Sequence, residues 1–411
     1  STEGFNDPAL NGQPITIVII RNTADSQGQL SVDNVRGVVI EAFDDTVDGG
    51  AGNDTIYGEA GNDVLFGEQD DDLLEGGAGD DVLEGGQGDD VLIGGDGNDT
   101  LAGAHRSDNN GQTGNDTLDG GGGDDVFIIT NDIGNGQITG GETGETTGDT
   151  LDAQFATAPM TITLSDLETG TISDGTSTTS FTEIENLVGS GASDTLDLNG
   201  LANPVSVVFS APGAGTITDS VTGEQITFSS IEQLILTDGD DTVDATADDG
   251  YTDIQGRDGA DEILGGTGND SLSGGADNDT LEGQDGNDSI DAGSGDDSVQ
   301  GGIGDDTLTG NEGADSIAGD DGDDLIIGDG PASTTGGSFG IFDLQSSGSG
   351  GIVVNGTFAF DATAPSLNIA VTDDDTALED NNTGAGSAVD AGAPQVLTSG
   401  ITIGSNTYPA G

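Results

Sequence analysis

Apolar residues recur at intervals of nine along two stretches of the chain, 49–128 and 256–327. In GGAGNDTIYGEAGNDVLFG, residues 49–67, one of them lies in the middle of each three-residue segment that follows an Asn-Asp pair. Such a segment predicts a short β-strand whose middle side chain points to one face and whose neighbours point to the other. The glycine-rich residues between the segments predict turns. Apolar residues at helical spacing are missing, so we expect no helix.

The nine-residue pattern G-G-x-G-x-D-x-U-x, in which U is apolar, occurs in sixteen copies, eight in each stretch. Position six is aspartate and position eight is apolar in every copy. Position four departs from glycine at Asp70 and Asp277, and position one departs from it at Ala292. The seventh copy takes up an insertion of eight residues after Gly103. This regularity predicts a flattened parallel coil in which two copies make one turn and successive strands stack about 4.8 Å apart.

Composition shows that this coil needs a positively charged ligand. The chain of 411 residues has 79 acidic side chains, four arginines and no lysine, which gives a net charge of −75. With 31% hydrophobic residues, this composition is close to that of disordered chains. One inward side chain per copy cannot offset an ordering cost of about 1–2 kcal/mol for each backbone residue. The same charge excludes nucleic acid and anionic membrane surfaces as partners.

The turns suit a hard metal ion. An aspartate carboxylate fixed beside several backbone carbonyls offers only oxygen ligands, which Ca²⁺ prefers, whereas Mg²⁺ requires a stricter octahedron. Stacked turns would give each ion ligands from two levels, so that the ion neutralises the carboxylates and joins the levels.

These repeats resemble the RTX (repeats-in-toxin) family closely over 49–128 and 256–327, and loosely in the flanking FDDTVDG and TDGDDTVD. The resemblance implies a parallel β-roll with Ca²⁺ in its turns and type I secretion of an unfolded chain that folds in external calcium. It implies that the metal ligands are the position-six aspartates together with turn carbonyls. We expect weaker binding at the terminal copies, and less regular sites at the turns that contain Asp70 and Asp277. The aspartates are Asp54, Asp63, Asp72, Asp81, Asp90, Asp99, Asp116, Asp125, Asp261, Asp270, Asp279, Asp288, Asp297, Asp306, Asp315 and Asp324.

Between the arrays the chain carries a longer repeat. Phe181, Ile184, Glu185 and Leu187 recur as Phe228, Ile231, Glu232 and Leu234, and both copies end in an Asp-Thr-apolar-Asp phrase. This segment alternates apolar and polar residues, which predicts strands with a core of their own, and its Ile-Glu pairs are expected at strand caps or ladder positions.

We therefore predict an all-β protein in which two Ca²⁺-binding β-rolls are joined by a non-canonical β-solenoid segment. The predicted parts are an N-terminal β cap, a first roll, a middle segment, a second roll and a small C-terminal β domain, over 1–40, 41–130, 131–236, 237–330 and 331–411.

The predicted function is structural and not enzymatic. Motifs such as HExxH and GxSxG and a cysteine nucleophile are missing, and the single histidine, His105, lies in the polar insertion beside Arg106. We expect an extracellular or cell-surface protein of a surface layer, filament, matrix or adhesin stalk, with no membrane insertion. Its expected partners are Ca²⁺, further copies of itself through segments 9–20 and 395–411, and possible cell-surface polysaccharide. The alternative is a secretion and folding module of a larger RTX enzyme, toxin or adhesin.

Overall fold

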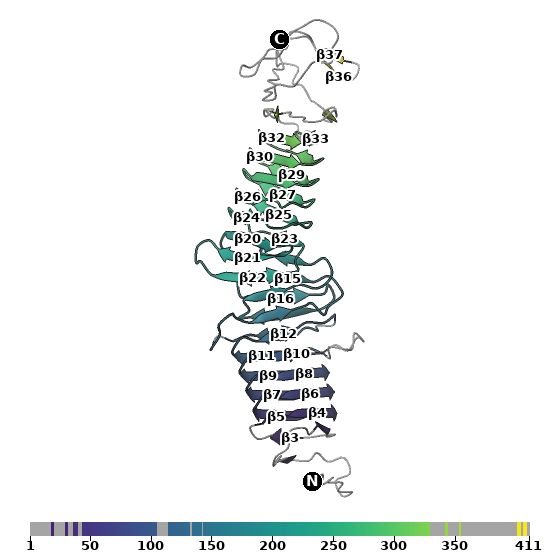
Figure 1. Cartoon of the computed structure of the whole chain (residues 1–411), viewed down its shortest axis with the longest axis vertical. Coiled ribbons are helices and arrows are strands. Elements are labelled where there is room, and N and C mark those ends of the chain that lie inside the picture. Colours follow the sequence, from purple (N-terminus) through teal and green to yellow (C-terminus); the bar gives the residue numbers. More distant parts are fainter. Residues whose placement is uncertain are drawn as a thin grey trace. The chain divides into compact units, whose positions relative to one another are not determined.

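The computed structural model describes residues 43–104, 114–131, 134–141 and 143–328 in full. Outside these ranges it describes only the backbone of short strands: β1 (Val18–Ile19), β2 (Gln29–Ser31), β3 (Arg36–Val39), β34 (Phe342–Asp343), β35 (Val353–Val354), β36 (Ile401–Ile403) and β37 (Asn406–Tyr408). The rest of the predicted N-terminal cap and C-terminal domain, and His105 and Arg106 in the insertion, lie outside the described residues. Within the fully described ranges every regular element is a β-strand, which confirms the all-β prediction (Figure 1).

The chain divides into two compact units, residues 1–202 with 223–233 and residues 203–222 with 234–411. The division falls within the predicted middle segment, at β23 (Gln233–Ile235). The five-part division drawn from the sequence stays a prediction.

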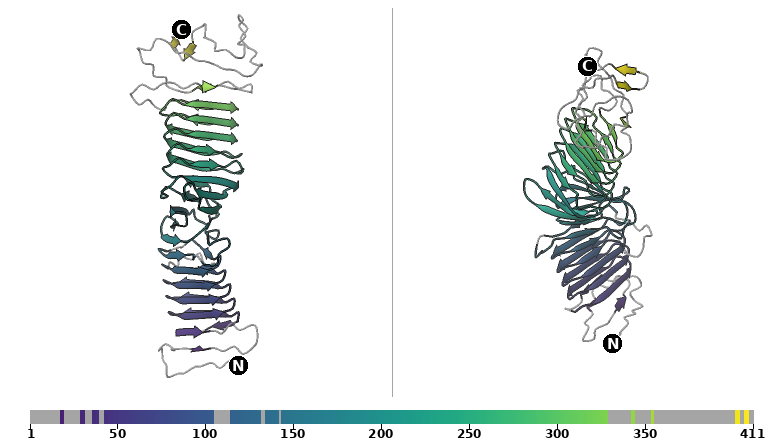
Figure 2. Two further views of the ribbon diagram at one scale, coloured as in Figure 1. Left: turned by 90° about the vertical axis from the view of Figure 1, so that its left-hand side faces the viewer. Right: turned by 45° about the horizontal axis from the view of Figure 1, so that its top comes forward.

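The first unit consists of two sheets whose strands alternate along the chain and pair mostly in parallel, one above the next (Figure 2). One sheet contains β5 (Thr55–Ala60), β7 (Leu73–Ala78), β9 (Val91–Asp96), β11 (Thr117–Gly122), β13 (Gln137–Thr139), β15 (Thr161–Asp166), β16 (Thr169–Ser173), β17 (Thr178–Thr182) and β19 (Thr195–Asp197). The other contains β4 (Thr46–Ala51), β6 (Val64–Gln69), β8 (Val82–Gln87), β10 (Thr100–Ala102), β12 (Val126–Ile128), β14 (Thr150–Asp152), β18 (Asn186–Val188) and β22 (Gln225–Ser229).

The second unit repeats this arrangement. Its first sheet contains β25 (Asp253–Asp258), β27 (Ser271–Ala276), β29 (Ser289–Ser294), β31 (Thr307–Thr309) and β33 (Leu325–Ile327). Its second contains β20 (Val205–Ala211), β21 (Ala214–Asp219), β24 (Thr242–Asp244), β26 (Glu262–Leu264), β28 (Thr280–Asp285), β30 (Ser298–Ile303) and β32 (Ser316–Asp321).

The nonapeptides pack as the sequence predicts at position eight. All sixteen of these apolar side chains are buried, and residues one level apart lie directly opposite each other, as Leu65 does with Leu83. Identical positions therefore stack along each sheet and form a narrow core.

The strands are longer than predicted. The sequence suggests a three-residue strand at positions seven to nine, but most array strands continue through positions one to three of the next copy, as in Thr55–Ala60. Glycine is a poor strand former. Here the level above holds positions two and three in the ladder, since Glu59 pairs with Gly77 and Ala60 with Ala78. The turn is therefore confined to positions four to six.

The middle segment adds antiparallel strands to the parallel stack, because β15, β16 and β17 in the first unit form a meander and β20 and β21 in the second form a hairpin. These strands bury several apolar side chains each, as β15 does with Ile162 and Leu164 and β20 does with Val205, Val207 and Phe209, whereas most array strands bury one. This part of the protein has the core of its own that its alternating pattern predicts.

Candidate metal centre

The structure places the sixteen position-six aspartates in equivalent turns, each directly before a strand. Fifteen are buried, and Asp116 is the most exposed of these at 9%. Asp324, in the last copy, is half-buried. A turn that buries an aspartate at every level requires a compensating interaction for each carboxylate, since a buried charge without one is costly.

In every one of these aspartates after Asp54, one carboxylate oxygen accepts a backbone N–H of the level below. The backbone N–H of Asp54 donates to Oδ1 of Asp72 at 2.7 Å, eighteen residues later, and the N–H of Asp261 donates to Oδ1 of Asp279 at 2.9 Å. In parallel, the N–H of Leu73 donates to the carbonyl of Asp54 at 3.0 Å. Two copies therefore make one level, and each aspartate belongs to two successive levels.

The second carboxylate oxygen has no such partner at most positions. Among the described residues, Oδ2 is buried without a hydrogen-bond partner in Asp63, Asp72, Asp81, Asp90, Asp99, Asp125, Asp261, Asp279, Asp288, Asp297 and Asp306. In the regular copies this atom faces the position-one glycine. A Cβ atom built on Gly85 would clash with Oδ2 of Asp90 and lie 2.8 Å from the carbonyl oxygen of Gly103. Each such hole is therefore lined by a carboxylate oxygen and by the carbonyl of the next level.

This donor set fits calcium. Each hole offers a carboxylate oxygen and a backbone carbonyl oxygen, which are hard ligands, and they approach each other closely because the position-one glycine has no side chain. The position-six aspartate and the position-one carbonyl of the following level would hold the ion. A bound Ca²⁺ would supply the positive charge that the buried carboxylates lack and would join adjacent levels.

Burial also shifts the acidity of these carboxyl groups. Desolvation, with neighbouring aspartates adding to it, raises the pKa of Asp63 and Asp72 to about 7 and the pKa of Asp90 to about 8. In the second array desolvation raises the pKa of Asp261 and Asp306 to about 7. Without a metal, the folded turn therefore favours the protonated acid near neutral pH, and a divalent cation would favour the carboxylate.

The hydrogen bonds between position-six aspartates form a ladder along each sheet. The side chains at position five form a second such ladder, which was not predicted from the sequence. The N–H of Asp80 donates to Oδ1 of Asn62 at 3.2 Å, and the N–H of Asn98 donates to Oδ1 of Asp80 at 3.0 Å. This ladder runs in the opposite sense to that at position six. Its signal was available, because position five is Asn or Asp in fourteen of the sixteen copies, Ala260 and Ala314 being the exceptions.

The two copies that lack glycine at position four keep the turn. Asp70 and Asp277 adopt positive φ angles of 71° and 77°, in the left-handed region that the glycines of other copies occupy. Asp72 and Asp279, two residues later, are buried like the other position-six aspartates. The structure thus preserves both turns, and their lower affinity stays a prediction.

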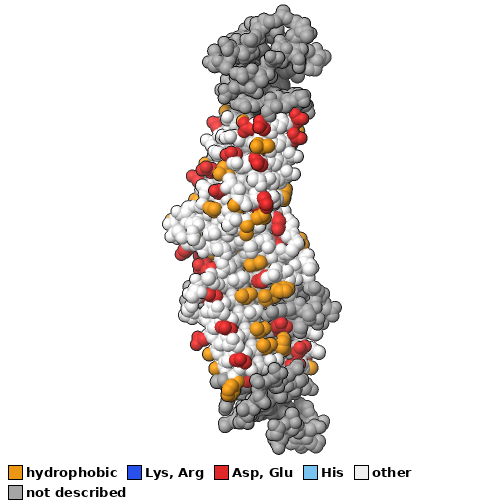
Figure 3. All heavy atoms as spheres, viewed as in Figure 1, with side chains coloured by type: hydrophobic (Ala, Val, Ile, Leu, Met, Phe, Trp, Pro, Cys, Tyr) orange, Lys and Arg blue, Asp and Glu red, His pale blue; other side chains and the backbone are white. Residues whose placement is uncertain are grey.

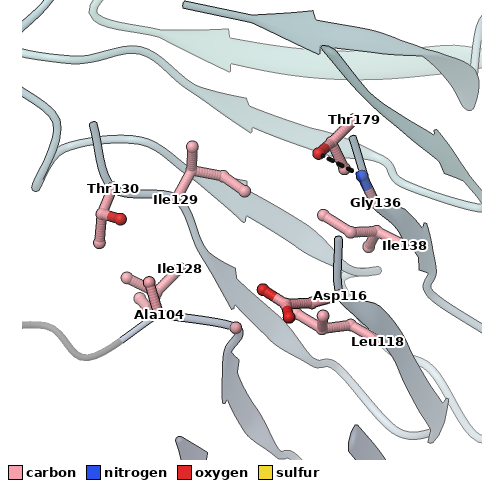
Figure 4. A pocket seen from close by; sticks show the side chains of 10 residues that line it. Ala104, Asp116, Leu118, Ile128, Ile129, Thr130, Gly136, Ile138 and Thr179 are labelled. Carbon is pink, nitrogen blue, oxygen red and sulfur yellow. Dashed lines mark hydrogen bonds between the residues drawn. The ribbon is translucent and has the colours of Figure 1, made fainter. Parts of the chain in front are cut away.

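The ladder of the first array ends differently in its two sheets. Above Asp116, the N–H of Gly136 donates to the hydroxyl of Thr179 at 3.2 Å, where the array would supply a carboxylate. Asp116 and Thr179 line a small cavity with Ile128, Ile129 and Ile138 (Figure 4). In the other sheet Glu185 takes over, as its Oε2 accepts the N–H of Asp149 at 2.5 Å. Glu232 accepts the N–H of Asp194 at 2.8 Å in the same way. Both glutamates directly precede a strand, β18 and β23, which is one of the two positions expected of the Ile-Glu pairs.

Three further buried aspartates, Asp149, Asp194 and Asp241, precede strands that lie between the two runs of nonapeptides and were not among the predicted ligands. Their signal was the Asp-Thr-apolar phrase at 149–151, 194–196 and 241–243. In two of them the protein satisfies both oxygens. Asp194 accepts the N–H of Met160 and the N–H and hydroxyl of Ser190, and Asp241 accepts the N–H groups of Val205 and Thr237. These two carboxylates need no metal.

The outer surface is also acidic. Figure 3 shows Asp and Glu side chains spread along the face drawn, with apolar side chains between them. Arg257, the one basic residue whose side chain is described, pairs with Asp238 at 2.9 Å. No helix in the described part of the chain is long and apolar enough to cross a membrane.

Comparison with known families identifies the arrays. A family profile described as RTX calcium-binding nonapeptide repeat (4 copies) matches residues 41–74, 66–101, 110–128, 255–290, 264–299, 274–308 and 300–330. No curated protein is significantly similar to the chain. The matched residues are those whose turns bury the aspartates and leave their second oxygens facing the position-one glycines. Both arrays therefore consist of RTX calcium-binding nonapeptide repeats, and they are folded as a parallel β-roll.

Proposed function

We propose that this protein is an extracellular, non-catalytic structural protein that folds when it binds calcium ions in both arrays. The observation that carries the proposal is the row of buried Oδ2 atoms without hydrogen-bond partners, such as those of Asp63, Asp81 and Asp288. Each would be an uncompensated charge in the metal-free fold, so binding to the folded state alone would shift the folding equilibrium.

The calcium dependence supports a location outside the cell. Sites built from one carboxylate and several carbonyls carry little charge per ion, and low ligand charge gives the weaker, millimolar range of calcium affinities typical of extracellular modules. A chain with a net charge of −75 would stay unfolded where calcium is scarce and fold where it is abundant.

A structural role is supported by the large share of the chain that repeats and strands occupy. Nonapeptides and other β-strands occupy nearly all of the described residues, which favours a surface layer, filament, matrix component or stalk. Self-association through exposed strand edges at the ends of a stack, and contact with cell-surface polysaccharide, belong to the same proposal.

Circular dichroism and light scattering of the full chain, with calcium and with excess chelator, test this proposal. We expect the β-signal to collapse in chelator and to return when calcium is restored, and the scattered intensity to rise when the folded chain assembles. A β-signal unchanged in excess chelator would contradict calcium-dependent folding. A monomer at high calcium and protein concentration would contradict self-assembly and leave the role of a spacer or stalk.

A further inference from the structure

Three carboxylates converge where the first array meets the middle segment. Glu145, Asp149 and Glu185 each place a carboxylate oxygen within 4.8 Å of the others, and Asp149 is fully buried. Like charges this close repel strongly in a partly buried site. Arg257, the one basic side chain that the structure describes, pairs with Asp238.

Asp149 independently indicates a missing ligand. Its Oδ1 accepts the N–H of Asp125 at 2.7 Å, as in the array ladder, but its Oδ2 is buried with no hydrogen-bond partner. This atom faces the same hole as the carbonyl oxygen of Glu183, where a Cβ atom on Gly140 would clash with both. An anionic oxygen and a carbonyl oxygen directed at one space point to a cation.

The local chain explains how this site differs from those of the arrays. Gly140 and Gly141 begin what reads as an expanded repeat, in which Glu145 lies in the enlarged loop before Gly148 and Asp149. The next level supplies Glu185 in place of a position-six aspartate, and Glu183, two residues earlier, adopts a left-handed φ of 60°. A site in the arrays has a single carboxylate, that of its position-six aspartate, whereas this site has three carboxylates.

We propose that Glu145, Asp149 and Glu185, with the carbonyl of Glu183, form a divalent-cation site of the calcium type that fastens the first array to the middle segment. The inference rests on the proposed function, since it takes calcium as the ion. Higher ligand charge raises calcium affinity, so this site fills before those of the arrays. The middle segment then provides a formed level on which the array can stack.

The test is a calcium titration of the full chain by isothermal calorimetry, with circular dichroism on the same samples. The E145Q/E185Q double variant removes two charges but keeps an amide oxygen at residue 185 to accept the N–H of Asp149. The matched control is E262Q, which removes the charge of an exposed glutamate on β26. The E145Q single variant leaves the ladder bond of Glu185 untouched and covers the case in which the double variant does not fold.

We expect the unmodified chain and E262Q to have a few high-affinity calcium sites, which fill before the array sites. In E145Q/E185Q these sites should lose one ion, or bind it at least about tenfold more weakly, while saturating calcium restores the β-signal. Tight sites of unchanged number and affinity in both glutamine variants would overturn this inference and leave the proposed function standing. An unmodified chain that binds no calcium would overturn both.

Discussion

Ala292 is the one residue other than glycine at position one of the sixteen copies, and it is fully buried. At the neighbouring copy, a Cβ atom on Gly283 would meet Oδ2 of Asp288 and the carbonyl oxygen of Gly301. By the register of the repeat, the Ala292 methyl group lies in the corresponding hole beside Asp297. Neither residue has a positive φ angle, so the side chain and not the backbone distinguishes the two copies.

We predict that Ala292→Gly adds one calcium ion to the number bound at saturation, and that Gly283→Ala removes one. The reason is that the methyl group occupies the space between the two oxygen ligands. Calorimetric stoichiometry measures both changes. An exposed alanine-to-glycine change, Ala51→Gly, serves as the control for backbone entropy, which costs about 0.5–1 kcal/mol. Equal stoichiometry in all variants would show that the hole is not the calcium site.

At the scale of the elements, the arrays and the middle segment hold their buried aspartates by different means. Most array carboxylates, such as those of Asp63 and Asp288, leave Oδ2 without a hydrogen-bond partner, whereas Ser190 and Thr237 satisfy the corresponding atoms of Asp194 and Asp241. The strands between the arrays also bury large side chains such as Phe181 and Met160. Calcium is therefore a structural requirement of the nonapeptides more than of the strands between them.

We predict that excess chelator makes the amides of β5, β7 and β9 exchange rapidly with solvent deuterium, while those of β15, β16 and β19 remain slow. Hydrogen exchange with mass spectrometry resolves these segments. The calcium-loaded chain, in which both groups should exchange slowly, is the control. Rapid exchange in both groups after chelation would mean that the middle segment does not fold without the arrays.

Much of this arrangement can be predicted from the sequence, because the nonapeptide repeats its own surroundings. A residue at position six or eight is stacked on its equivalents, so the burial of Asp63 and Leu65 follows from the period alone. The contribution of Glu185 cannot be predicted in this way. It lies 36 residues from Asp149, whereas the regular ladder joins residues 18 apart, and only the folded chain brings the two together.

At the scale of the whole molecule, proton binding and calcium binding oppose each other. The unfolded chain titrates its aspartates near the ordinary value of about 3.9. In the metal-free fold desolvation raises the pKa values of Asp72, Asp99 and Asp279 to about 7 and that of Asp90 to about 8. The metal-free fold thus holds more protons than the unfolded chain between about pH 4 and 8, and it loses stability as pH rises through 7 and 8.

We predict that the calcium-free chain gains β-signal as pH falls from 8 to 5, and that calcium binding to this protonated fold releases protons. The second effect arises because calcium must displace protons from the carboxyl groups of the fold, whereas the unfolded chain holds none of them at neutral pH. Circular dichroism at fixed pH measures the first effect, and calorimetry in two buffers of different ionisation enthalpy measures the second. Sodium chloride screens the surface charges more than the buried ones. A control at high salt therefore separates the effect of repulsion between surface charges from the effect of protonating the turn aspartates. A calcium-free β-signal that does not depend on pH between 8 and 5 would contradict the assignment.

The eighteen-residue ladder also determines how such a protein can change in length. The ladder tolerates extra residues inside a copy, since Asp90 reaches Asp116 across 26 residues by the same bond that joins Asp72 to Asp90. Gain or loss of two copies leaves every later strand in its own sheet, whereas a change of one copy moves each later strand to the opposite sheet. The segment that follows the first array has two unlike sides, one ending in Thr179 and the other in Glu185. Duplication is therefore restricted to pairs of copies, and the eight copies of each array make four whole turns.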